Sequence, residues 1–118
     1  MRKLRVFVVE DEALVAMLIE DLLHDMGHDV GPVESRIEDA LGTARHGHFD
    51  VAIIDLNLDG RSSYPIADIL LERGVPFIFA TGYGANGLDP RYSGTPVLVK
   101  PFTATELENI LSRLQESI

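Results

Sequence analysis

The sequence predicts an α/β protein whose core is an open, parallel five-stranded sheet, made from a strand–helix unit repeated five times. Short runs rich in Val, Ile and Phe alternate with stretches that have helical periodicity. The runs at 51–55 and 75–80 are apolar almost throughout, which is typical of strands buried on both faces. Alternating strands and helices imply right-handed crossovers, so helices should cover the sheet.

Five apolar runs are the expected strands, and the intervals between them carry the helices. The runs lie at 4–9, 28–33, 51–55, 75–80 and 95–99. Apolar residues recur every three or four positions over 12–26 and 64–73, and Gly27 and Gly74 follow as helix-ending residues. Residues 81–94 hold four glycines and a proline, so we expect a long loop there with at most a short helical piece.

Two further helices have capping signals. Ser35 and Glu38 have the spacing of a capping box before the helix that follows the second strand. Thr103 and Glu106 repeat this spacing before the last helix. We therefore expect both helices to begin with reciprocal hydrogen bonds between the two members of the box.

The composition fits one domain over residues 1–118 and excludes several classes of protein. A chain of 118 residues with a hydrophobic share of 46% can bury a core without cross-links, and it contains no cysteine. The net charge of −9 opposes direct nucleic-acid binding. No apolar run reaches the roughly 20 residues of a membrane span, and acids interrupt the N-terminal run before a signal-peptide core could form. We expect a cytoplasmic protein that binds neither nucleic acid nor membrane directly.

Polar side chains stand at the ends of four expected strands. Glu10 and Asp11 follow the first strand, and Asp55 ends the third. Thr81 follows the fourth strand and Lys100 the fifth. In an open parallel sheet these ends lie at one edge, where ligand sites form. Two carboxylates about 4 Å apart repel by about 4 kcal/mol at an effective dielectric of about 20. One lysine offsets only part of this repulsion and Mg²⁺ suits oxygen ligands, so the pattern predicts a magnesium site.

The same cluster predicts phosphoryl chemistry. A carboxylate beside Mg²⁺ can attack phosphorus, because the metal screens the incoming charge and orients the phosphoryl oxygens. Asp55 is the candidate acceptor. Thr81 can donate a hydrogen bond to one phosphoryl oxygen, and Lys100 can pair with another.

The motifs VVEDE, IIDLNL, ATG and LVKPF follow one another at these strand ends. With them the chain resembles, along essentially its whole length, the receiver domain of bacterial two-component response regulators. The resemblance implies a flavodoxin-like (βα)5 fold with strand order 2-1-3-4-5. The catalytic residues that it implies are Asp55, Thr81 and Lys100, and the implied Mg²⁺ ligands are Asp11, Asp55, the backbone carbonyl of Asn57 and, through water, Glu10.

The resemblance also implies a cis peptide bond before the proline at 100–101. The sequence departs from the family pattern at two places. Asp59-Gly60 stands where many receivers have Pro-Gly, and it adds a negative charge near the site. Val97 replaces the usual Tyr or Phe three residues before the lysine. The segment PFIFATGYG resembles a receiver subgroup marked by FATGY and often found as stand-alone domains. Tyr83 is our candidate for a substitute switch residue.

We expect a phosphorylation-dependent switch rather than an enzyme. A sensor histidine kinase or a phosphotransfer protein would donate the phosphoryl group to Asp55 with Mg²⁺ bound, and the altered face would change its binding to a downstream protein. The chain shows no effector domain, so we expect output by protein–protein contact from a monomer or weak dimer. The alternatives are a phosphate sink, a non-phosphorylated interaction module of the same fold, and a small Mg²⁺ phosphohydrolase. The last is disfavoured because Asn57 stands where such enzymes usually have a second acid.

Overall fold

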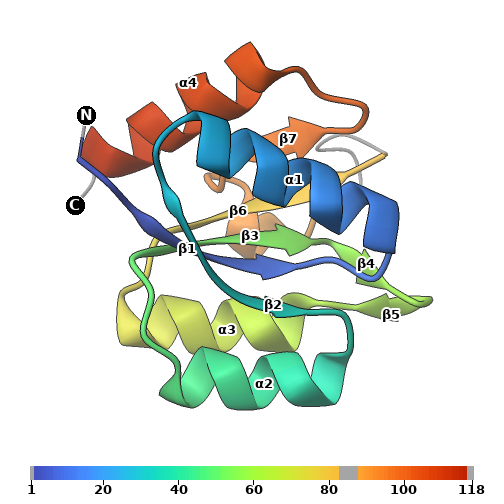
Figure 1. The fold of residues 1–118 in the computed structure, drawn as a ribbon. Helices are drawn as coiled ribbons and strands as arrows, with labels where there is room; N and C mark the ends of the chain where they lie inside the picture. Colours follow the sequence, from blue (N-terminus) through green and yellow to red (C-terminus); the bar gives the residue numbers. More distant parts are fainter. Residues whose placement is uncertain (1, 83–87, 117–118) are drawn as a thin grey trace.

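The structure, a computed structural model, describes residues 2–82 and 88–116 and has one parallel five-stranded sheet between two layers of helices (Figure 1). Its strands are β1 (Arg5–Val9), β2 (Asp29–Glu34), β3 (Val51–Asp55), β6 (Phe77–Thr81) and β7 (Val97–Val99). They lie in the order β2-β1-β3-β6-β7, and every neighbouring pair is parallel. Strands β4 and β5 form a separate hairpin, so β6 and β7 are the fourth and fifth strands of this sheet. The predicted order 2-1-3-4-5 is therefore confirmed.

Two helices cover each face of the sheet. Helices α1 (Ala13–Asp25) and α4 (Ala104–Glu116) lie on one face, and α2 (Ile37–His46) and α3 (Tyr64–Arg73) lie on the other (Figure 1). Between β6 and β7 the described residues form only a short 3-10 helix, η1 (Pro90–Tyr92), in agreement with the expected lack of a full helix there. Within the described residues, no helix is long and apolar enough to cross a membrane.

The strand side chains alternate between two apolar cores. Val6 and Val8 of β1 belong to the core under α1 and α4. Phe7 and Val9 belong to the core under α2 and α3. The same two-residue period continues in β3 and β6, so these strands are buried on both faces as predicted.

A small hairpin extends the chain beyond β3, and the sequence reasoning missed it. It pairs β4 (Asn57–Leu58) with β5 (Arg61–Ser62), and these strands are antiparallel (Figure 1). Asp59 and Gly60 form its two-residue turn, with φ of 50° and 80°. Positive φ at both central residues is the requirement of a type I′ turn, for which Asp-Gly is a preferred pair.

The capping box predicted for α2 is wrong. The residue that caps the helix is Arg36, one position after Ser35, and no side chain caps the first turn. Glu38 instead accepts a hydrogen bond at 2.7 Å from Arg61 of β5. Arg61 of the hairpin therefore binds the Glu38 carboxylate that a capping box would need.

The other predicted helix boundaries are confirmed. The backbone N–H of Thr103 donates to the Glu106 carboxylate at 3.0 Å, and the N–H of Glu106 donates to the Thr103 hydroxyl at 3.1 Å. Gly27 and Gly74 follow α1 and α3 with φ of 82° and 72°, a conformation that glycine adopts without strain.

Candidate functional site

The parallel register brings the predicted polar residues to one edge of the sheet. Asp55, the last residue of β3, is paired with Ala80, so it stands beside Thr81 at the end of β6. The backbone N–H of Lys100 donates to the carbonyl of Thr81 at 2.8 Å. Glu10 follows β1 directly. The ends of four strands therefore deliver these groups to a common place, as the sequence predicted.

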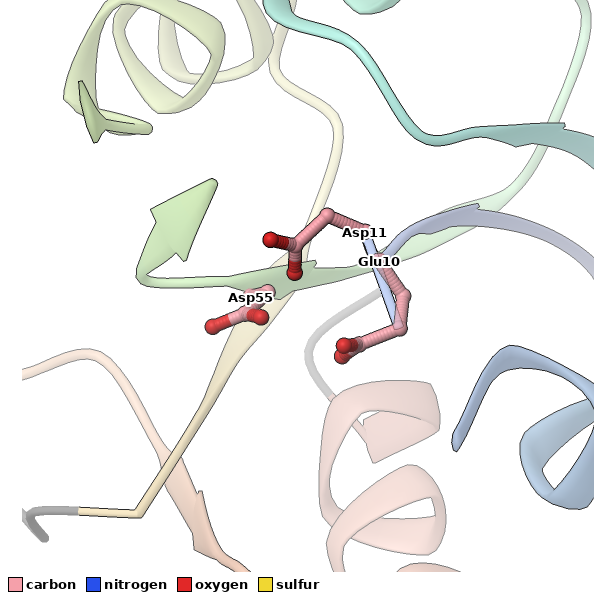
Figure 2. A group of neighbouring side chains, drawn as sticks. All are labelled: Glu10, Asp11 and Asp55. Atoms are coloured by element: carbon pink, nitrogen blue, oxygen red, sulfur yellow. The ribbon is translucent and has the colours of Figure 1, made fainter. Parts of the chain in front are cut away.

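Three carboxylates share this place. Glu10, Asp11 and Asp55 each offer an oxygen, and these oxygens all lie within 4.8 Å of one another. Figure 2 shows the three side chains turned toward a shared space, with Asp11 and Asp55 facing each other. Glu10 and Asp55 are only 2% and 7% exposed, so bulk water does little to screen their repulsion.

Lys100 is the counter-ion of the two buried acids. Its Nζ lies 2.7 Å from Oε2 of Glu10 and 3.2 Å from Oδ2 of Asp55. Burial by itself lowers the pKa of Lys100, but the hydrogen bond and charge of Glu10 and those of Asp55 outweigh it, so the pKa is raised and the ammonium stays charged. The ammonium of Lys100 therefore offsets part of the repulsion between Glu10 and Asp55.

One lysine leaves the carboxylate of Asp55 short of positive charge. Burial, assisted by the negative charge of Glu10, raises the pKa of Asp55 to about 7. The backbone N–H of Asn57, 3.2 Å from Oδ1, and the ammonium of Lys100 oppose this shift only in part. A second cation would therefore favour the ionised form of Asp55.

The hairpin turn orients the third acid. The backbone N–H of Asp59 donates to Oδ2 of Asp11 at 2.8 Å. The turn is closed by the N–H of Gly60, which donates to the side-chain Oδ1 of Asn57 at 2.9 Å. The sequence reasoning treated Asp59 only as an extra charge, although the Asp-Gly pair at 59–60 was a signal for the turn that holds Asp11.

These groups line an open cavity of about 600 Å³. Its polar wall contains Asp11, Asp55, Asn57, Thr81 and Lys100. Its apolar wall contains Val15 and Leu18 of α1 together with Phe102. The cavity has room for a phosphoryl group and water beside the acids.

The donor set fits a hard divalent cation. All three clustered side chains are carboxylates, the open cavity leaves places for water, and the two buried acids share a single ammonium. Mg²⁺ prefers oxygen ligands from one or two carboxylates with water and phosphate completing its shell. Asn57, whose backbone carbonyl the resemblance implies as a ligand, borders the cavity.

The departures from the family pattern have clear places in the fold. Val97 packs, half-buried, beside the core under α2 and α3. The largest fully buried side chain of the described residues is instead Tyr92, whose ring packs against Phe79 and stacks on Tyr64 while its hydroxyl donates to Asp68. Tyr83 lies outside the described residues. The cis bond between Lys100 and Pro101 is confirmed.

Comparisons with known proteins agree with the fold and give the family. Residues 6–112 match the family described as response regulator receiver domain. A search of curated proteins finds no match.

Several solved structures are similar to the chain. The chain is 37% identical to SdrG from Sphingomonas melonis Fr1, over 98% of this chain and 99% of that one, with a TM-score of 0.86. A structure of the BeF3-activated conformation of SdrG, ascribed to Pseudomonas melonis Fr1, has 37% identity over 97% and 98% of the chains and a TM-score of 0.81. The receiver domain of PhyR from Erythrobacter litoralis has 28% identity over 97% and 91% and a TM-score of 0.84. Because the family match spans most of the chain and its strand ends carry the acids and the lysine, the chain belongs to the response regulator receiver domains.

Proposed function

We propose that this chain is a phosphorylation-dependent signalling switch of the cytoplasm, in which Asp55 accepts a phosphoryl group. The observation that carries the proposal is the position of Asp55, a buried carboxylate held by Lys100 at 3.2 Å and open to the same cavity as Asp11. Receiver domains of this family are signalling modules of two-component systems rather than enzymes. The order of the motifs in this chain supports the same use of its pocket.

Glu10, Asp11 and Asp55 would hold Mg²⁺, with the backbone carbonyl of Asn57 as a further ligand and Glu10 acting through water. When bound, the ion would supply the positive charge that the three acids lack and would polarise the phosphoryl oxygens. The oxygen-only donors and the charge imbalance around Asp55 support this assignment. The related SdrG has a BeF3-activated conformation, which supports a phosphoryl site in the corresponding pocket here.

In the transfer step, an ionised oxygen of Asp55 attacks the phosphorus of a phosphohistidine. A P–O bond forms, the P–N bond breaks, and the departing imidazole takes a proton from solvent, leaving an acyl phosphate on Asp55. Lys100 pairs with one phosphoryl oxygen, and the Thr81 hydroxyl donates to another. The close placement of both residues at the carboxyl edge of the sheet supports these roles.

The acyl phosphate would then change the population of two conformations. It adds negative charge next to Thr81 and Lys100, which are joined by a backbone hydrogen bond of 2.8 Å. Drawing them toward the phosphoryl group would favour a state in which the surface of β7 and α4 binds a downstream protein differently. We place the chain in the FATGY subgroup, on its PFIFATGYG motif and on Val97 in the position of the usual aromatic residue.

The phosphodonor would be a sensor histidine kinase or a phosphotransfer protein. The outer face of α1 exposes Leu14 and Met17, which are 81% and 57% exposed, and Leu18 both reaches the surface and lines the cavity. Apolar side chains beside the mouth of a charged pocket suit contact with a protein that brings its phosphohistidine to Asp55.

The test is the response to Mg²⁺ with beryllofluoride, followed by amide NMR shifts. We expect the wild-type protein to show shifts around Thr81 and Lys100, and Asp55→Asn to show none of them while keeping its fold. Asp25→Asn, at the exposed end of α1, is the control and should respond like wild type. A wild-type protein that does not respond would favour the non-phosphorylated interaction module, and a response in Asp55→Asn would reject Asp55 as the acceptor.

A further inference from the structure

We propose that the β4–β5 hairpin is a positioning element for the cation, and that its turn at Asp59 and Gly60 holds Asp11 in the orientation in which it ligates Mg²⁺. The inference rests on the cation site of the proposed function and deepens it. It assigns a role to a segment that carries no ligand side chain of its own. The order of the hairpin and the affinity for the cation are then coupled.

The three acids of the site are oriented by two different devices. Lys100 fixes Glu10 and Asp55, with Nζ at 2.7 and 3.2 Å from their oxygens. Asp11 is not part of that network, and its Oδ2 accepts the backbone N–H of Asp59 at 2.8 Å. Over residues 2–82 and 88–116, no other hydrogen bond or ion pair reaches the carboxylate of Asp11.

The direction of the Asp59 N–H is set by the turn and not by the side chain of residue 59. Both turn residues have positive φ, and the N–H of Gly60 is bound to Oδ1 of Asn57. The hairpin is fixed to the domain at two points. Leu58 is 1% exposed within the core under α2 and α3, and Arg61 is bonded to Glu38 of α2 at 2.7 Å.

This arrangement preorganises one oxygen of Asp11. With Oδ2 held by the turn, Oδ1 remains free to ligate a cation in the cavity that Asp11 shares with Asp55. Groups that orient a metal ligand from behind typically change metal affinity by about 10- to 100-fold when they are lost. Binding is reciprocal, so the bound cation should also stabilise the turn.

Gly60 allows the turn to be disturbed without replacing a ligand. A Cβ added at Gly60 would meet no atom within 4 Å, so Gly60→Ala introduces only the backbone strain of a positive φ of 80°. Gly27, after α1, offers a matched control, because its φ is 82° and an added Cβ would again meet nothing within 4 Å. The two substitutions should lower the melting temperature equally.

The experiment is a Mg²⁺ titration of the full chain by isothermal calorimetry. We expect Gly60→Ala to weaken Mg²⁺ binding by about tenfold and Gly27→Ala to leave it within twofold of wild type. Asp59→Asn keeps the N–H and tolerates the left-handed conformation, so its affinity should stay within about threefold. In wild type, Mg²⁺ should also slow hydrogen exchange of the Asp59 amide.

The outcomes separate this inference from the proposed function. If wild type binds Mg²⁺ and Gly60→Ala binds it equally well, the positioning role is overturned and the cation site stands. An effect of Asp59→Asn as large as that of Gly60→Ala would also overturn it, because the charge of residue 59 would then set the affinity. A wild-type protein that binds no Mg²⁺ at millimolar concentration would reject the cation site itself.

Discussion

The carboxyl and amino edges of the sheet both bury polar groups, but they surround them differently. At the carboxyl edge, Glu10 and Asp55 lie side by side and share the ammonium of Lys100. Their repulsion is offset only in part, and the pKa of Asp55 is raised to about 7 as a result of burial and of Glu10. This edge holds more negative charge than the fold itself can satisfy.

At the amino edge, side-chain acceptors are matched to backbone donors, although Nε2 of His28 is buried without a partner among the described residues. Buried His28 accepts the N–H of Leu4 through Nδ1 at 3.0 Å, and Asp50 accepts the N–H of Arg5 at 2.8 Å. These bonds satisfy backbone groups at the beginning of β1. From this difference we infer that His28 and Asp50 at the amino edge stabilise the fold, whereas the clustered acids at the carboxyl edge reduce stability, as is usual at functional sites.

Removing the ammonium of Lys100 from the carboxyl edge should change the free energy of unfolding most. Lys100→Met leaves Glu10 and Asp55 buried without their partner, and breaking a buried ion pair costs about 3 kcal/mol. Urea denaturation at pH 8 without divalent cations measures this loss. Lys3→Met removes an exposed pair with Asp29 at the amino edge and should cost less than about 1 kcal/mol. Equal losses in the two variants would contradict the proposed contrast between the edges.

Removing His28, the buried hydrogen-bond acceptor of the amino edge, should have the next largest effect on the free energy of unfolding. His28→Leu leaves the N–H of Leu4 buried without a partner, so the free energy of unfolding should fall by about 2 kcal/mol. His24→Leu, on the exposed end of α1, is the control and should change stability by less than about 0.5 kcal/mol. A neutral His28→Leu would mean that its bond to β1 contributes nothing to the fold.

Neutralising Asp55 at the carboxyl edge should raise the free energy of unfolding. Asp55→Asn removes one of two adjacent buried charges, and we expect a gain of about 1 kcal/mol in metal-free protein. Asp50→Asn at the other edge should lower stability, because it weakens the bond to the N–H of Arg5. Millimolar Mg²⁺ should stabilise wild type but not Asp55→Asn. A loss of stability in Asp55→Asn would show that the carboxyl edge is not strained by charge.

The smallest expected effect is a pH dependence from the amino edge. Burial lowers the pKa of His28 below its usual 6.5, against an opposing effect of Glu108. The unfolded chain therefore takes up this proton first, so the contribution of His28 is full above pH 6.5 and is lost as the pH falls toward its folded pKa. Denaturation at pH 7.5 and 5.5 should show a steeper loss in wild type than in His28→Leu. Parallel curves would assign the acid sensitivity to other groups.

The sequence predicted the elements that follow regular periods. Strands buried on both faces are visible as unbroken apolar runs, and a parallel sheet then requires that residues such as Asp55 and Lys100 meet at one edge. The convergence of the strand ends follows from that topology alone. The capping box at Thr103 and the helix ends at Gly27 and Gly74 were predictable because their signals are local in the sequence.

What the sequence could not predict depends on contacts between distant segments. Ser35 and Glu38 have the spacing of a cap, but Arg61, 23 residues beyond Glu38, takes the carboxylate. The hairpin strands have two residues each, which is too short for a two-residue period to be visible. Tyr92 lies in a glycine-rich segment that the sequence predicted to be a loop. Its burial against Phe79 depends on tertiary packing, which the local sequence does not show.

The hydrogen bond from the backbone of Lys100 to the carbonyl of Thr81 has a mechanical consequence. It joins the last residue of β6 to the first residue after β7, so moving one of them strains or breaks its bond to the other. A displacement of Thr81 would therefore be felt at Lys100, where the chain leads into α4.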